Sequence, residues 1–233
     1  MLDALRYEII RFRSLRSTWI LLFAGLAMQF LIALIWAGHH DMTTDARFGQ
    51  SFLGLFLVLA VLPCIAVAVN AFGHEYRYRT IIPTTLTLRT PGRILGAKAV
   101  VAAAAGAASG AALVAVTLLA ETLGDGGPAD AGLVGRVLLG AVLFGVLCSL
   151  AGLGVAALSR NGTIALIVMV VFPTIIEIGL EQAKVPASIL PFWSAEVFLT
   201  STGAGRWAQP LPLLIVVAVL LAASWLSLRR RDA

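Results

Sequence analysis

Three polar side chains lie within or at the edge of long apolar stretches, where polar groups are few. They are Asn70, Thr174 and Glu177, and the last two closely follow Pro173. Glu177 is the most informative of the three, because an ionisable group in hydrocarbon is costly and usually serves a function. The alternative interpretation is that Glu177 only reaches the polar surface at the end of its apolar stretch.

The motifs of several enzyme classes are missing from the chain. It lacks G-x-x-x-x-G-K-[ST], the loop that cradles nucleotide phosphates, and the zinc-binding H-E-x-x-H. The adjacent His39 and His40 do not have the spacing of metal ligands, and residues 122–125 lack the first glycine of an intramembrane aspartyl protease Gly-x-Gly-Asp. We therefore expect no catalytic residue and no metal site, and we predict that the chain is not an enzyme.

Composition places the whole chain in a membrane. Of the 233 residues, 60% are hydrophobic and 12% are charged, whereas soluble domains carry about 25% charged residues. This excludes a water-soluble domain, a disordered chain and a nucleic-acid-binding domain, although the net charge is +5. The length suits a single membrane domain over residues 1–233.

Six long stretches contain no Asp, Glu, Lys or Arg, and five of them reach the roughly 20 residues that a transmembrane helix needs. The stretch 161–176 reaches that length only if the helix continues through Glu177. We predict an all-α membrane protein with six transmembrane helices. Their approximate bounds are 18–37, 52–72, 99–120, 135–158, 162–180 and 209–228.

Charge asymmetry predicts the orientation of these spans. Thirteen of the 17 basic and four of the 12 acidic residues lie on the side of the two termini, which gives +9 there and −4 on the other side. Both termini are therefore expected in the cytoplasm.

The segment before the first span is predicted to be an amphipathic helix on the inner membrane surface. Leu2, Leu5, Ile9 and Phe12 fall on one helical arc, and arginines lie beside it. The alternative is a basic flank that only sets orientation.

Residues 73–98, between spans 2 and 3, are too polar to span the membrane and too apolar for a free loop. We predict a helix that continues past His74, a short helix around 84–88 and a turn at Pro91-Gly92. This segment could dock on a cytoplasmic partner or lie against anionic lipid.

Residues 185–195, between spans 5 and 6, form a charge-free run of 11 residues, too short to cross. They predict an external re-entrant or interfacial helix, which serves either as a lid or as an anchor.

Small residues recur every four positions in spans 3 and 4, a spacing that lets helices approach closely. We expect these positions to pack within one subunit, with dimerisation as the alternative. Pro63 and Pro173 are expected to kink spans 2 and 5. The small residues are Ala102, Gly106 and Gly110 in one span and Ala141, Gly145 and Ser149 in the other.

Together these features resemble the type 2 permeases of ATP-binding-cassette transporters, in their half-size form. The loop motifs Glu75-Tyr76-Arg77, Thr80-Ile81, Thr90-Pro91 and Gly96-Ala97-Lys98, together with Arg93, carry most of the resemblance. The family usually has glycine before the threonine, where this chain has Arg79.

The resemblance implies two permease subunits, identical or different, and separate ATPase subunits that hold the ATP and Mg²⁺. It implies that spans 2 and 5 line the translocation path, with Asn70, Thr174 and Glu177 near it. The external lid would include Pro191, Phe192 and Trp193. A coupling helix between spans 2 and 3 would contact the ATPase through Glu75, Tyr76, Arg77, Arg79, Thr80, Thr84, Leu86, Arg89 and Arg93.

The expected function is therefore ATP-driven export of an amphiphilic or hydrophobic compound through a bacterial plasma membrane, with the bilayer and the ATPase as partners and no nucleic acid. Fifteen arginines against two lysines are typical of a GC-rich bacterial genome. The alternatives are a non-transporting sensor or immunity subunit of such a complex, and a stand-alone secondary carrier.

Overall fold

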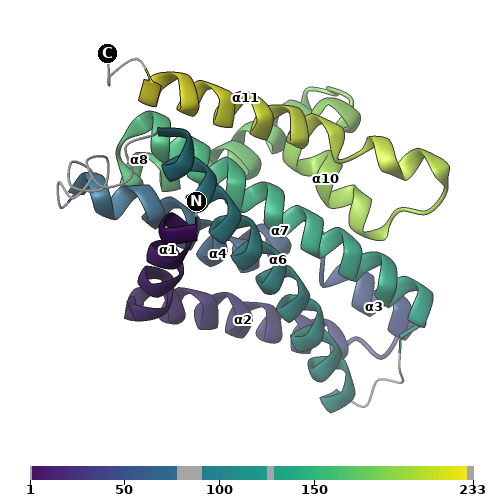
Figure 1. Ribbon diagram of the computed structural model, residues 1–233. Coiled ribbons are helices and arrows are strands. Elements are labelled where there is room, and N and C mark those ends of the chain that lie inside the picture. Colours follow the sequence, from purple (N-terminus) through teal and green to yellow (C-terminus); the bar gives the residue numbers. More distant parts are fainter. Residues whose placement is uncertain (1, 78–90, 125–128, 230–233) are drawn as a thin grey trace.

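The computed structural model describes residues 2–77, 91–124 and 129–229, and this part of the chain is helical, with no strand in it (Figure 1). Long helices run beside one another, and short helices lie at their ends. The helices are α1 (Leu2–Ser14), α2 (Arg16–Ala37), α3 (Thr44–Gln50), α4 (Leu55–Arg77), α6 (Pro91–Leu123), α7 (Ala131–Ser159), α8 (Gly162–Val171), the π-helix η1 (Phe172–Glu177), α9 (Ile178–Gln182), the 3₁₀ helix η2 (Ala187–Ile189), α10 (Pro191–Thr200), the 3₁₀ helix η3 (Ala204–Ala208) and α11 (Leu211–Arg229).

Within the described residues, five helical runs are long and apolar enough to cross a membrane. They match the predicted spans 1, 3, 4, 5 and 6. The predicted span 52–72 corresponds to α4, which packs against α2, α6, α7 and α8. The five runs are Arg16–Ala37, Gly92–Leu123, Ala131–Ser159, Gly162–Gln182 and Gly205–Arg229.

The start of α6 corrects one sequence prediction. The helix begins at Pro91, so the expected turn at Pro91-Gly92 is wrong. Proline fits the first position of a helix, because its missing N–H would have no partner there and its φ angle is already helical. The prediction that α4 continues past His74 is confirmed, since α4 ends at Arg77.

Helix α7 is the centre of the bundle and contacts α4, α6, α8, α10 and α11. Its closest neighbour is α6, and the two backbones approach without intervening side chains. A Cβ atom built on Gly110 would lie 2.3 Å from the carbonyl oxygen of Ala141, and one on Gly106 would lie 2.4 Å from that of Gly145. The predicted packing of these small residues within one subunit is confirmed.

Proline affects the two predicted kink positions differently. Pro173 lies in η1, a π-helical turn between α8 and α9, so the backbone there departs from α-helical geometry. Pro63 lies within α4, which continues as one helix across it.

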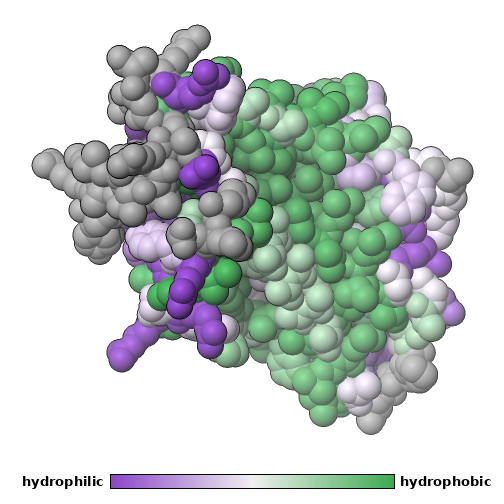
Figure 2. Space-filling model, viewed as in Figure 1, coloured by the Kyte–Doolittle hydropathy of each residue, from purple (hydrophilic) through white to green (hydrophobic). Residues whose placement is uncertain are grey.

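The shape is that of a membrane bundle with two polar ends. Figure 2 shows a broad hydrophobic belt over the middle of the molecule and hydrophilic residues toward both ends. Helix α1 crosses one end of this belt, at a steep angle to α2 and α6 (Figure 1). Helix α3 lies toward the other end.

Candidate functional site

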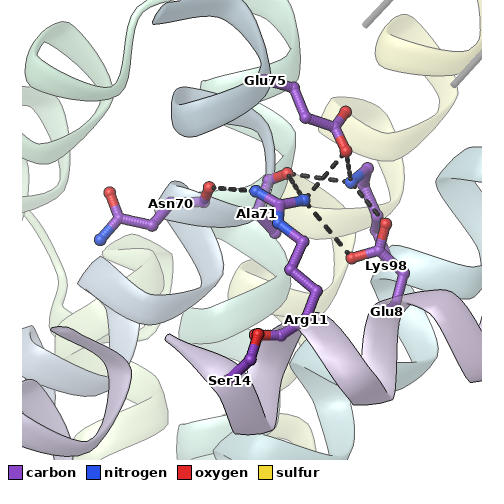
Figure 3. Close-up of polar contacts among 7 residues, drawn as sticks. All are labelled: Glu8, Arg11, Ser14, Asn70, Ala71, Glu75 and Lys98. Carbon is purple, nitrogen blue, oxygen red and sulfur yellow. Dashed lines mark hydrogen bonds and ion pairs between the residues drawn. The ribbon is translucent and has the colours of Figure 1, made fainter. Parts of the chain in front are cut away.

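Four charged side chains from three helices meet at the end of the bundle that carries α1 (Figure 3). Glu8 and Arg11 come from α1, Glu75 from the last turns of α4, and Lys98 from the early turns of α6. The Nζ atom of Lys98 lies 2.7 Å from a carboxylate oxygen of Glu8 and 2.7 Å from one of Glu75. We call this group the ion cluster.

The two cations of the ion cluster are satisfied within the protein. Lys98 Nζ also donates to the carbonyl oxygen of Ala71 at 2.9 Å, so its three protons have three acceptors. Arg11 donates to the carbonyls of Ala71 and Asn70, at 2.9 and 3.1 Å, and to Glu75 at 2.9 Å. Two acids and two bases leave the cluster without net charge, which is how buried ions are tolerated.

The helical repeat explains why these residues converge. Glu8 and Arg11 are three positions apart on α1 and share a face. Ala71 and Glu75 are four positions apart on α4, so a carbonyl and a carboxylate face the same way. Helices α4 and α6 flank residues 78–90, so the ion cluster lies where both ends of that connection enter the bundle.

The helix predicted before the first span is confirmed as α1, but the face that it buries is not the predicted apolar arc. Ala4 and Glu8 are buried, whereas Ile9 and Ile10 are about half exposed. The face that turns to the bundle is the one that carries Glu8 and Arg11, and the predicted apolar arc lies beside it. The predicted arc was defined by hydrophobic residues alone, so it did not include the charged residues through which α1 contacts α4 and α6.

The residues expected to contact an ATPase separate into three groups. Glu75 is 1% exposed and enclosed by α1 and α6, which corrects the expectation that its side chain faces a partner. Tyr76 stacks on Phe72 with ring centroids 6.1 Å apart, Arg77 ends α4, and Arg93 is exposed near the start of α6. The remaining residues and the predicted helix at 84–88 lie outside the described part: Arg79, Thr80, Thr84, Leu86 and Arg89.

The three predicted path residues do not form one group. Asn70 lines a cavity of about 670 Å³ with Arg160 and Asn161, near the end of the bundle that holds the ion cluster. Thr174 and Glu177 line a small pocket further along, after the π-helical turn has begun. The Thr174 hydroxyl donates to the carbonyl oxygen of Val170 at 2.5 Å.

Glu177 caps α10, a role that neither sequence interpretation included. Its side chain is buried, and its two oxygens accept hydrogen bonds from the backbone N–H groups of Phe192 and Trp193, at 2.9 and 2.7 Å. These groups belong to the first turn of α10, which has unpaired N–H donors and attracts negative charge. The predicted lid residues Pro191, Phe192 and Trp193 are therefore tied to the fifth predicted span.

The helices after the fifth predicted span differ from the single helix predicted at 185–195. Residues 187–189 form one 3₁₀ turn, and α10 then continues to Thr200. Helix α10 packs against α7 and α11, and its buried side chains include Phe198 and Leu199.

Glu196 on α10 is a further buried acid, which the sequence analysis missed. Its side chain accepts a hydrogen bond from the backbone N–H of Gly54. Burial is the main cause that raises the pKa of Glu196 to about 7; the Gly54 N–H lowers it, and the charges of Glu177 and Glu181 raise it further. The signal was present in the sequence, because Glu196 directly follows a charge-free apolar run.

Replacing Glu196 with glutamine is expected to remove a pH dependence of stability. With a folded pKa near 7 and a reference value of 4.5, the folded protein binds the proton more tightly than the unfolded chain. Stability therefore falls as the pH rises from about 4.5 to 7, by on the order of 3 kcal/mol in total. Thermal unfolding in detergent between pH 5 and 8.5 should show Glu196→Gln above the native protein at pH 8 and close to it at pH 5. The exposed Asp41→Asn is the control, and parallel pH curves for Glu196→Gln and the native protein would contradict the prediction.

Comparison with known proteins gives one family. A family model described as "ABC-2 family transporter protein" matches residues 4–177. The match begins within α1, includes all four residues of the ion cluster and ends at Glu177, the residue that caps α10. No curated protein matches the chain.

Proposed function

Because this chain belongs to the ABC-2 transporter family, we propose that it is the membrane-spanning permease subunit of an ATP-driven exporter. Its ATP and Mg²⁺ are held by a separate ATPase subunit, and a second permease subunit, identical or different, completes the complex. The cargo is an amphiphilic or hydrophobic compound. The single observation that carries the proposal is the family match over residues 4–177.

The proposed topology has six spans, with α4 as the second. Helix α4 has 23 residues, and the helices packed around it belong to runs that are long and apolar enough to cross a membrane. The charge distribution supports two cytoplasmic termini, because the end that carries α1 is the positively charged one. The chain then lies in the plasma membrane of a bacterium.

The ion cluster supports a route by which an ATPase could act on the bundle. In the proposal, residues 78–90 contact the ATPase and transfer its movement to α4 and α6. Lys98 joins these helices to α1 through Glu75 and Glu8, so the three elements move as one unit. ATP binding favours one state of the bundle only to the extent that the ATPase binds the two states with different affinity.

The external segment is proposed as a lid that responds to the fifth span. Glu177 holds the first turn of α10, so a change in the π-helical turn would displace α10 directly. π-helical turns are frequent at functional sites. In this proposal Thr174 and Glu177 lie at the outer end of the path, and Asn70 lies at its inner end.

A charge placed in the connection between α4 and α6 tests the proposed coupling. We expect Leu86→Arg to reduce co-purification of the co-expressed ATPase at least about tenfold, since burying an unpaired charge in an interface is costly. Accumulation of the permease itself should be unchanged. Leu123→Arg makes the same change at an exposed site on the opposite end of α6 and should leave ATPase binding intact.

Three outcomes would contradict parts of the proposal. Full ATPase binding and ATP-dependent vesicle uptake by Leu86→Arg would remove this connection from the coupling interface. ATPase binding without transport of any compound would favour a sensor or immunity subunit. Transport by the chain alone, without ATP, would favour a secondary carrier.

A further inference from the structure

An apolar groove of about 450 Å³ opens on the side of the bundle between α1, α2 and α6. Helix α1 contributes Ile9 and Phe12 to one wall, and α2 contributes Trp19 and Phe23 to the other. The floor is α6, where most of the lining residues are alanine or valine. Among the lining side chains only Cys64, Ser109 and the indole of Trp19 carry polar groups, so the groove excludes a polar ligand.

The dimensions of the groove favour a thin, extended occupant. The floor runs from Val100 to Ala112, which is about 18 Å along a helix that rises 1.5 Å per residue. This is close to one leaflet, half of the roughly 30 Å hydrocarbon core. An extended acyl chain matches both the length and the apolar lining of the groove.

The exposed charges on the two helices that form the walls favour an anionic ligand. Helix α1 turns Glu8 inward to Lys98, whereas Arg6 and Arg13 are exposed. Arg16, the first residue of α2, is exposed as well. The wall at this end includes Trp19, whose indole N–H donates to the carbonyl oxygen of Arg13 at 3.1 Å. This hydrogen bond holds the backbone of Arg13 beside the apolar wall, at the turn between α1 and α2.

We propose that this groove binds one acyl chain of an anionic phospholipid, with the phosphate held by Arg13 and Arg16. The proposal concerns a resident lipid of the bilayer, and it stands whether or not an ATPase drives this chain. Bound there, the lipid would contact α1, α2 and α6 at once, and α1 is the helix that supplies half of the ion cluster.

The test is quenching of Trp19 fluorescence by brominated lipid. The full chain is placed in phosphatidylcholine nanodiscs that contain increasing fractions of brominated phosphatidylglycerol or brominated phosphatidylcholine. Subtracting the signal of Trp19→Phe isolates the Trp19 component. We expect half-maximal quenching at about tenfold lower mole fraction for phosphatidylglycerol, as one or two arginines near an anionic headgroup would produce.

Three variants assign the effect to the groove. Arg13→Gln with Arg16→Gln should abolish the preference for phosphatidylglycerol and leave the weaker quenching by phosphatidylcholine. Ala104→Leu with Ala108→Leu fills two exposed positions of the floor and should reduce quenching by both lipids. Ala115→Leu makes one substitution of the same kind at an exposed position of α6 outside the groove and should change neither.

Two results would overturn the proposal. Equal quenching by both lipids, unaffected by the floor variants, would mean that Trp19 contacts only the lipids that surround any membrane protein. Quenching by the isolated chain that disappears in the complex with a second permease subunit would assign the groove to that subunit.

Discussion

Replacing Lys98 with methionine is expected to remove most of the folded protein. The substitution keeps the length of the side chain but leaves the buried carboxylates of Glu8 and Glu75 with only Arg11 as a counter-ion. Breaking a buried ion pair on one side typically costs about 3–5 kcal/mol, because the remaining charge stays desolvated. Thermal unfolding in detergent and the yield of monodisperse protein should both fall sharply. Arg93→Met removes an exposed cation five residues earlier on α6 and should have little effect.

A second substitution separates the ion cluster from a general defect of α6. Adding Glu75→Gln to Lys98→Met removes one of the two acids that then share a single arginine, so the double variant should be more stable than Lys98→Met alone. Measured with the single variants, this gives the coupling between the two positions. Equal losses for Lys98→Met and Arg93→Met, or strict additivity with Glu75→Gln, would mean that the ion cluster does not hold α1, α4 and α6 together.

A single methyl group at Gly110 is expected to separate α6 from α7. Its Cβ would lie 2.3 Å from the carbonyl oxygen of Ala141 and 2.6 Å from the carbonyl carbon, both backbone atoms that no rotamer change can move. Overpacking of this kind costs about 3 kcal/mol or more, and alanine's better helix propensity returns only about 1 kcal/mol. Gly110→Ala should therefore lower the unfolding temperature and the yield of folded protein.

Gly135→Ala is the matched control for Gly110→Ala, and its effect on stability is expected to have the opposite sign. Gly135 lies in α7, and a Cβ built there has no neighbour within 4 Å. Gly135→Ala should therefore be neutral or stabilising in the same unfolding assay. Similar destabilisation by both variants would mean that loss of any glycine from these helices lowers stability. That result would contradict the close approach of α6 and α7.

The positions of the helices were predictable, because apolar length and flanking charge are local properties of a sequence. Five of the predicted spans match helical runs of the described residues that are long and apolar enough to cross a membrane, and the span predicted at 52–72 corresponds to α4. The start of α6 was less predictable, since Pro91-Gly92 suits both a turn and the first turn of a helix. The small residues Gly106 and Gly110 were assigned correctly, because their spacing fits a close helix contact and little else.

The pairing of charges was not predictable from the sequence. Glu8 is 90 positions from Lys98, and Arg11 is 64 positions from Glu75. At the end of a span, a charge that pairs inside the bundle has the same local context as one that faces lipid headgroups. One weak signal was present, since Lys98 is one of only two lysines beside 15 arginines.

The position of Lys98 has a consequence for the order in which the chain is assembled during synthesis. Glu8 and Arg11 leave the ribosome first, and Glu75 follows with the end of α4. The cation that completes their neutralisation comes more than twenty residues after Glu75. Until then the nascent chain carries two acids against one arginine at this site. The ion cluster is therefore completed only when the early turns of α6 have been added, and full docking of α1 is expected to follow that step.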